Sequence, residues 1–217
     1  YDFIRRNSPK SAVIVGGGFI GLEMAENLVD RGIDVSLCDM ADQVMPPMDK
    51  DMAKIVEIRL AEKGVNLYLG NGLKDIQNDG AVVTLANGTT LETELAILSI
   101  GVKPNSQIAE AAGLELNERR GIKVDKYMRT SDENIYAVGD VIGVTDYILG
   151  NETMIPLAGP ANKQGRNVAE NILDIGKKTY DGTLGTSVAK IFDMTVASTG
   201  ASEKSLNRAG KVYGKDY

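Results

Sequence analysis

The sequence predicts an α/β fold, and three patterns in its first hundred residues predict it. An apolar, β-branched run, "SAVIVGG", leads through glycines at 16, 18 and 21 into a segment with apolar residues at helical spacing. Strand-like and helix-like segments then alternate up to residue 70, as in a parallel sheet with crossover helices. Between residues 73 and 100, "NDG" and "ANG" separate short strand-like segments, as in tight hairpins. We therefore expect a Rossmann-like unit whose parallel sheet is interrupted by an antiparallel meander.

Local signals place the elements of this unit. The first strand, "SAVIVGG", precedes the helix "GLEMAENLVDRG", which Gly32 ends, and "DVSLCD" is the second strand. Pro46 and Pro47 exclude a helix before about Asp49. A helix over 49–63 then ends at Gly64, and it is followed by the strand "VNLYLG" and, after the meander, by the closing strand "ELAILSIG".

The glycine motif predicts a dinucleotide site. Gly16 allows the tight turn, Gly18 lets the backbone approach a pyrophosphate, and Gly21 lets helix and strand pack closely. The pyrophosphate would lie on the helix N-terminus, where free N–H groups and the helix dipole favour an anion. The alternative is a glycine-rich turn that joins strand to helix and holds no ligand.

Asp39, at the end of the second strand, indicates which dinucleotide binds. Its carboxylate can accept hydrogen bonds from both ribose hydroxyls of NAD(H), whereas it would repel a 2′-phosphate, and no arginine follows in the loop. The sequence therefore favours NAD(H) over NADP(H). The alternative for Asp39 is a solvated loop carboxylate.

Four further residues are expected beside the same cofactor. We place Phe19 and Glu23 in the first turn of the helix, where Glu23 either stabilises the helix dipole or accepts a hydrogen bond from the nicotinamide carboxamide. Phe19 would then lie over the ring pocket. Ile20, in the same turn, and Gly101, after the closing strand, complete the residues that we expect to contact NAD(H).

The pattern changes near Pro104 and Asn105, where we place a domain boundary. A short helix over 106–112 is followed by an extended segment that leads to the strand "NIYAVGD". A helix over about 158–175, strands within "TLGTSVAKIFDMTVASTG" and a helix with Ser202 as its N-cap complete the expected elements.

Composition and charge argue against several classes of partner and site. The net charge of −6 with no basic block argues against nucleic acid as a partner, and no apolar run is long enough to span a membrane. The cytoplasm is therefore the default location.

The chain has no histidine and a single cysteine, Cys38, so we expect no intrachain disulfide, no metal site and no catalytic side chain. Because it begins at Tyr1 and stops soon after a strand-and-helix unit, we expect a piece of a longer protein.

Five segments in order resemble one enzyme family. "VIVGGGFIGLEMAENL", "VMPPMD", "AILSIGVKPN", "TSDENIYAVGDV" and "IPLAGPANKQGRNVAENI" are similar to motifs of the FAD-dependent pyridine nucleotide-disulfide oxidoreductases. The branch with coenzyme A-disulfide reductase, NADH oxidase and NADH peroxidase is the most similar. The resemblance extends from about Ser8 to Lys211.

The resemblance implies three domains and a second cofactor. Residues 8–104 would be an NAD(H)-binding domain inserted into a split FAD-binding domain, 105–178 the second half of that FAD domain, and 179–217 the start of an α+β dimerisation domain. In this interpretation Gly139 permits close approach and Asp140 binds a ribityl hydroxyl of FAD. Leu157 and Ala158 would contact the flavin through their backbone, at a helix N-terminus that stabilises a reduced, anionic flavin.

The chain departs from the family pattern at its redox centre. Nothing corresponds to the first FAD-binding glycine motif or to the redox cysteine, and we expect Cys38 to be a packing residue. The resemblance implies an enzyme, a homodimer, that passes hydride from NADH to FAD and then electrons to a disulfide, oxygen or peroxide. This chain alone would be incomplete for catalysis and would carry no stoichiometric flavin.

Two other functions fit the residues less well. A stand-alone, non-catalytic NADH-sensing module remains the main alternative. A simple NAD dehydrogenase lacks support, because the chain has neither histidine nor a Tyr-x-x-x-Lys pair to move a proton.

Overall fold

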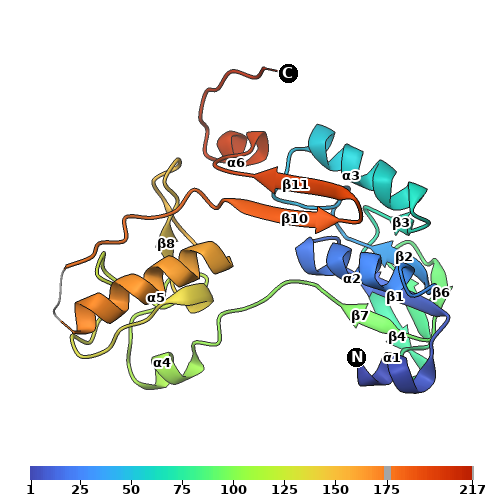
Figure 1. Ribbon diagram of the computed structural model, residues 1–217, viewed down its shortest axis with the longest axis horizontal. Helices are drawn as coiled ribbons and strands as arrows, with labels where there is room; N and C mark the ends of the chain where they lie inside the picture. The colour runs from blue at the N-terminus through green and yellow to red at the C-terminus, as the bar shows by residue number, and fades with distance from the viewer. Residues whose placement is uncertain (174–176, 217) are drawn as a thin grey trace. The chain divides into compact units, whose positions relative to one another are not determined.

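A computed structural model describes residues 1–173 and 177–216 of the chain (Figure 1). The chain divides into two compact units. The first unit comprises Tyr1–Gly101 together with Ala189–Val196, and the second comprises Val102–Val188 together with the residues from Ala197 onward. We describe each unit by itself.

A four-stranded parallel sheet forms the centre of the first unit. Its order is β3-β2-β1-β7, and every neighbouring pair is parallel. The strands are β1 (Ser11–Val15), β2 (Asp34–Cys38), β3 (Asn66–Tyr68) and β7 (Ala96–Leu98). The α/β class predicted from the sequence is confirmed, although β3 and β7 are shorter than the sequence predicts, because only these residues form ladder hydrogen bonds.

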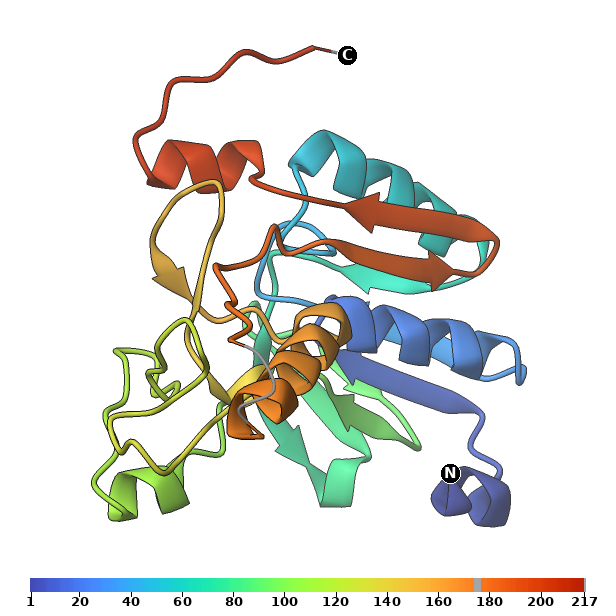
Figure 2. The ribbon, with the colours of Figure 1, turned by 60° about the vertical axis from the view of Figure 1, so that its left-hand side comes forward.

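The two faces of this sheet carry different layers. Successive side chains of a strand point to opposite faces, so Ala12 and Ile14 of β1 belong to one buried cluster and Val13 and Val15 to another. The first cluster includes residues of α2 (Phe19–Val29) and α3 (Lys50–Glu62). The second includes Val83 and Leu85 of the meander. The parallel sheet therefore lies between a helical layer and an antiparallel layer (Figure 2).

The meander forms the expected three-stranded antiparallel sheet. Its strands are β4 (Leu73–Gln77), β5 (Val82–Leu85) and β6 (Thr90–Glu92). "NDG" forms a 3-10 turn, η1 (Asn78–Gly80), in which all three residues have positive φ. In the "ANG" turn, Gly88 also has positive φ and donates to Leu85 O. Residues that tolerate the left-handed conformation therefore stand where the two reversals require it.

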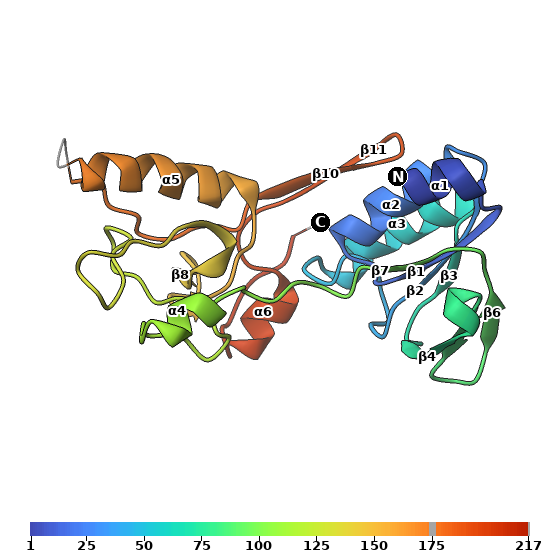
Figure 3. The ribbon, with the colours of Figure 1, turned by 90° about the horizontal axis from the view of Figure 1, so that it is seen from below.

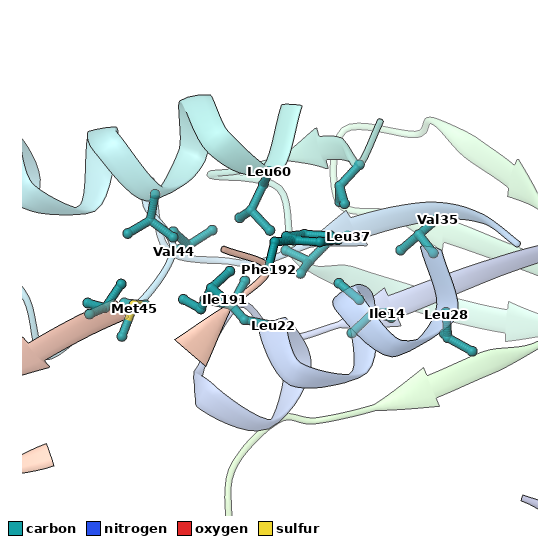
Figure 4. Close-up of a cluster of buried hydrophobic side chains, with 14 of the residues drawn as sticks. Ile14, Leu22, Leu28, Val35, Leu37, Val44, Met45, Leu60, Ile191 and Phe192 are labelled. Atoms are coloured by element: carbon teal, nitrogen blue, oxygen red, sulfur yellow. The ribbon is translucent and has the colours of Figure 1, made fainter. Parts of the chain in front are cut away.

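A second segment joins the helical layer from much later in the chain. In the hairpin of β10 (Ser187–Ile191) and β11 (Met194–Ser198), Ile191, Phe192 and Val196 are buried in the cluster of α2 and α3. Figure 4 shows Ile191 and Phe192 among Leu22, Leu37 and Leu60. Residues 189–196 therefore pack within the first unit, and where a third domain begins stays a prediction.

The turn of this hairpin is also held by polar groups of both helices. Phe192 N–H donates to Glu26 Oε2 of α2 at 2.9 Å. The Arg59 guanidinium of α3 donates to the Asp193 carboxylate from Nε, at 2.8 Å, and from Nη2. Lys63 Nζ lies 5.5 Å from the centre of the Phe192 ring. The hairpin is thus fixed to α2 and α3 by contacts that the sequence pattern does not indicate.

The second unit has a smaller core and shorter elements. Its core holds Ala109, Ile122, Ile142 and Val144, with partly buried neighbours. Its elements are α4 (Gln107–Ala111), the 3-10 turn η2 (Gly139–Val141), β8 (Val144–Thr145), β9 (Glu152–Thr153), α5 (Ala158–Ile172) and α6 (Glu203–Arg208). Figure 3 shows the long α5 helix of this unit in side view. The first unit has one more short helix, α1 (Asp2–Asn7), near the start of the chain.

One expectation for the residues after 101 is wrong, and a second can be compared with the structure only in part. The predicted strand "NIYAVGD" is wrong, because Tyr136 forms only an isolated bridge with Arg129 and residues 139–141 turn into η2. An apolar run becomes a strand only where a neighbouring strand pairs with it. The predicted helix over about 158–175 is present to Ile172, and residues 174–176 lie outside the described residues. Ser202 caps α6 as expected and accepts a hydrogen bond from Ser205 N–H.

Candidate functional site: two glycine turns at helix ends

The first candidate site is the turn between β1 and α2. Gly16 has φ of +112°, and a Cβ there would lie 2.3 Å from Ser99 O. A Cβ on Gly21 would lie 1.9 Å from Gly16 O. Gly16 is therefore required by its backbone conformation and by the adjacent strand end, whereas a side chain at Gly21 would push the helix away from the turn, on which it lies directly.

The protein itself uses most polar backbone groups of this turn. Gly16 N–H donates to Cys38 O at 2.8 Å, and Gly17 O accepts from Met45 N–H at 2.8 Å. Ser99 Oγ donates to Gly16 O at 2.9 Å. The N–H groups of Gly18, Phe19 and Ile20 have no acceptor among the described residues, as is usual for the first turn of a helix. The groups left for an anion thus begin at Gly18.

Asp39 lies beside this turn at the end of β2. Its Oδ2 accepts from Gly17 N–H at 2.6 Å and its Oδ1 from Ala41 N–H at 2.8 Å. The side chain is half-buried, so it is not the solvated loop carboxylate of the alternative interpretation. Two hydrogen bonds fix the orientation of a carboxylate that still has free lone pairs.

The other residues predicted for this site have fewer contacts that would fix them there. Phe19 is the first residue of α2 and packs partly against the core, whereas Ile20 is 56% exposed. Glu23 is exposed, and its placement in the first turn is wrong, because α2 begins at Phe19 and Glu23 starts the second turn. Gly101 has φ of +92° with open space where a Cβ would be. Because Glu23 lies beyond the first turn of α2, its stabilisation of the helix dipole is weaker than expected.

The second candidate site is the turn η2 with the start of α5. Gly139 has φ of +85°, and its N–H donates to Gln164 Oε1 at 2.7 Å. Asp140 is exposed and has no hydrogen-bond partner among the described residues. Leu157 is the N-cap residue of α5 and Ala158 its first residue, with no side-chain cap. The turn thus carries a free carboxylate, and α5 begins with free N–H groups.

Two hydrogen-bonding side chains of these turns were missed at the level of sequence. Ser99 follows β7 and Gln164 lies in the middle of α5, and each holds a glycine of a turn that is far away in the chain. Gln164 is 1% exposed and is the only buried residue of α5. Nothing in the local sequence pattern marks either residue, so these contacts become visible only in the structure.

The Cys38 side chain takes no part in either site, although its backbone O accepts from Gly16 N–H. It is fully buried, and burial, reinforced by the neighbouring Asp39 charge, raises the pKa of its thiol to about 11. A buried thiol with a raised pKa is a poor nucleophile. Within the described residues there is also no group of three or more His, Cys, Asp or Glu side chains that could hold a metal ion, and no helix long and apolar enough to cross a membrane.

Comparisons with known proteins agree with the family resemblance. The model of the family described as pyridine nucleotide-disulphide oxidoreductase matches residues 1–165. An NADH oxidase of Methanocaldococcus jannaschii is 37% identical over 207 residues, which cover 94% of this chain and 46% of that protein. The chain therefore spans about half the length of this curated relative.

Solved structures of the same kind share the fold. Reduced CoADR-RHD of Bacillus anthracis has a TM-score of 0.96 at 49% identity, over 98% of this chain and 38% of that one. The water-forming NADH oxidase of Lactobacillus brevis, bound to NADH, has a TM-score of 0.88 at 31% identity, over 97% of this chain and 47% of that one. An engineered mutant of that oxidase, bound to NADPH, also has a TM-score of 0.88, at 29% identity over the same shares.

Proposed function

We propose that this chain, which belongs to the pyridine nucleotide-disulphide oxidoreductase family, supplies the NAD(H) site and part of the FAD site of a flavoprotein oxidoreductase. The observation that carries the proposal is the glycine turn, where the free N–H groups of α2 lie beside the fixed carboxylate of Asp39. The whole protein would pass hydride from NADH to FAD and then electrons to a disulfide or to oxygen. Relatives are named NADH oxidase and coenzyme A disulfide reductase.

The residues of the first unit fit a dinucleotide. The N–H groups of Gly18, Phe19 and Ile20 would donate to the pyrophosphate, and the positive end of α2 would stabilise its charge. Gly16 and Gly21 shape the turn, because both are packed against protein backbone and neither has room for a ligand at its Cα. Asp39 would accept hydrogen bonds from the ribose hydroxyls.

The residues of the second unit fit part of a flavin site. Asp140 offers a free carboxylate to a ribityl hydroxyl, and Ala158 offers a free N–H at the N-terminus of α5. Leu157 would contact the flavin beside it, although its own N–H donates to Ile155 O at 2.9 Å. When bound, FAD would supply the two-electron acceptor for the hydride. These roles go with the proposed domains at 8–104, 105–178 and 179–217, and with a homodimer as the whole assembly.

Asp39 favours NADH over NADPH, because its charge would repel a 2′-phosphate. The engineered oxidase that was solved with NADPH carries substitutions of a Gly, of an Asp eighteen residues later and of a Pro seven residues after that Asp. Gly21, Asp39 and Pro46 have the same two spacings. The residue after that Asp is changed to Arg in the mutant, and the corresponding residue here is Met40, which is 84% exposed.

Calorimetry with NADH and NADPH tests the proposal on the chain itself. We expect NADH to bind with one site per chain and more tightly than NADPH. The double variant Asp39→Ala, Met40→Arg should reverse the preference, because it removes the negative charge and adds a positive one. Ile108→Arg adds the same charge at a residue of α4 that is 84% exposed, and it should leave the preference unchanged. Equal or tighter binding of NADPH by the unmodified chain would contradict the assignment.

A further inference from the structure

The peptide unit between Gly16 and Gly17 is held at both of its polar ends. Its carbonyl oxygen, on Gly16, accepts from Ser99 Oγ at 2.9 Å. Its N–H, on Gly17, donates to Asp39 Oδ2 at 2.6 Å. A peptide unit is planar and trans, so its C=O and N–H point in opposite directions and rotate only together. Ser99 and Asp39 therefore act on opposite ends of one rigid group.

Ser99 is itself firmly placed. Its N–H donates to Val15 O at 2.7 Å, which extends the pairing of β7 with β1 by one residue. Its hydroxyl also lies 2.9 Å from Val15 O, so the single hydroxyl proton is shared between two carbonyls at the end of β1. Because the backbone of Ser99 is fixed by the sheet, its hydroxyl is a preorganised donor.

The position of Gly16 O matters for the helix as well as for the turn. A Cβ on Gly21 would lie 1.9 Å from Gly16 O and 2.8 Å from Ser99 Oγ. The oxygen that Ser99 holds is therefore the one against which α2 packs. If this peptide unit turned over, Gly16 O would point toward Asp39 and Gly17 N–H would leave the carboxylate.

We propose that Ser99 is a positioning residue for NAD(H): it fixes the Gly16–Gly17 peptide and, through Gly17 N–H, the Asp39 carboxylate. Ser99 does not touch the nucleotide. It keeps a carbonyl oxygen turned away from Asp39 and keeps the Asp39 carboxylate directed to the ribose. This inference rests on the proposed function and adds to it a residue outside the glycine motif.

The test compares three hydroxyl variants of the 217-residue chain. Ser99→Ala removes the hydroxyl and leaves Gly16 O without that donor, and we expect NADH affinity to fall about tenfold, which corresponds to one hydrogen bond. Ser99→Thr keeps the hydroxyl and should restore most of the affinity. Thr93→Val is the matched control, because Thr93 is at least as buried as the half-buried Ser99 and its Oγ1 donates to a backbone carbonyl, Leu95 O, at 3.0 Å, away from the turn.

Hydrogen exchange of the Gly17 amide, followed by NMR without nucleotide, separates positioning from general destabilisation. In Ser99→Ala this amide should exchange at least several-fold faster, while amides in the centre of β1 stay protected. Unchanged NADH affinity and Gly17 exchange in Ser99→Ala, or an equal loss of affinity in Thr93→Val, would overturn the proposal. Failure of the unmodified chain to bind NADH would overturn the proposed function, and the Gly17 exchange would still decide whether Ser99 fixes the turn.

Discussion

The two candidate nucleotide turns each contain a glycine with positive φ, but they differ in how they are supported. At the turn before α2, four polar backbone groups are bonded within the protein, and α2 buries Gly21, Leu22, Ala25 and Leu28. At the turn η2, Gln164 alone holds Gly139 by a side chain, and α5 buries no other residue. The difference shows that the first site is formed by its own unit, whereas the second offers groups that its own unit does not enclose.

The contrast follows from the cores beneath the two helices. α2 lies on a four-stranded parallel sheet, and its cluster extends through α3 to the hairpin of β10 and β11. The second unit has only two-residue strands, β8 and β9, within residues 102–173. A helix needs a sheet or another helix to bury an apolar face, and α5 has little of either within its unit.

The largest expected effect separates the glycines at the two helix starts. Gly21→Ala places a Cβ 1.9 Å from Gly16 O, so α2 must move away from the turn. We expect a loss of about 3 kcal/mol in the free energy of unfolding, as for severe overpacking, and weaker NADH binding. Gly159→Ala in the first turn of α5 meets no atom within 4 Å. It should leave stability unchanged or raise it by about 0.5 kcal/mol, and urea unfolding of both variants checks the contrast.

The next effect compares the apolar faces of the same helices. Leu22→Ala removes a fully buried side chain of α2 and should cost about 3 kcal/mol in urea unfolding. Ile172→Ala at the end of α5 changes a side chain that is 58% exposed and should stay within about 0.5 kcal/mol. If Ile172→Ala proved as costly as Leu22→Ala, α5 would be packed in solution as firmly as α2.

A smaller effect concerns the ion pair between Asp193 of the hairpin turn and Arg59 of α3. The hydrogen bonds from Arg59 lower the pKa of Asp193 from 3.8 to about 2. A lowered pKa in the folded state means that this contribution is complete above about pH 4 and is lost as the pH falls through about 2. Thermal unfolding between pH 2 and 5 should therefore show a weaker acid dependence for Asp193→Asn than for the unmodified chain. Asp30→Asn removes an exposed carboxylate at the C-cap of α2 and serves as the control for the loss of one negative charge.

The smallest effect is an expected lack of reaction at Cys38. Because its pKa is raised to about 11 and its side chain is fully buried, iodoacetamide at pH 8 should modify it only as fast as the first unit opens. Mass spectrometry with and without urea measures both rates. Rapid labelling of the native chain would show that the end of β2 is open, contrary to the dense packing of the first site.

The sequence predicted the first unit better than the second. The continuous apolar run in "SAVIVGG", the glycine spacing and the turn dipeptides depend on neighbours close in the chain, so the parallel sheet, the meander and the turn could be expected. The strand predicted in "NIYAVGD" failed because a strand depends on a pairing partner, which local pattern does not reveal. The contacts of Phe192 with Glu26 and of Asp193 with Arg59 join residues more than 130 positions apart, which also lies beyond local pattern.

The candidate site shows the same division. Gly16, Gly18, Gly21 and Asp39 could be named because a spacing marks them. Ser99 and Gln164 could not, because their importance lies in the backbone groups they reach, and a serine after a strand or a glutamine within a helix is common. Glu23 lies at the start of the second turn of α2 and not in the first turn as predicted. Helix starts are uncertain by a few residues in a prediction when no capping side chain marks them.

We infer that NAD(H) binds within the first unit alone, and an NMR titration of the 217-residue chain with NADH checks this inference. We predict that the amide signals of Gly18, Phe19 and Ile20 shift strongly, that those of Asp39 and Met40 shift with the same dissociation constant, and that Gly139–Val141 stay unchanged. Unchanged signals at Gly18–Ile20, or shifts confined to η2 and the start of α5, would contradict the account.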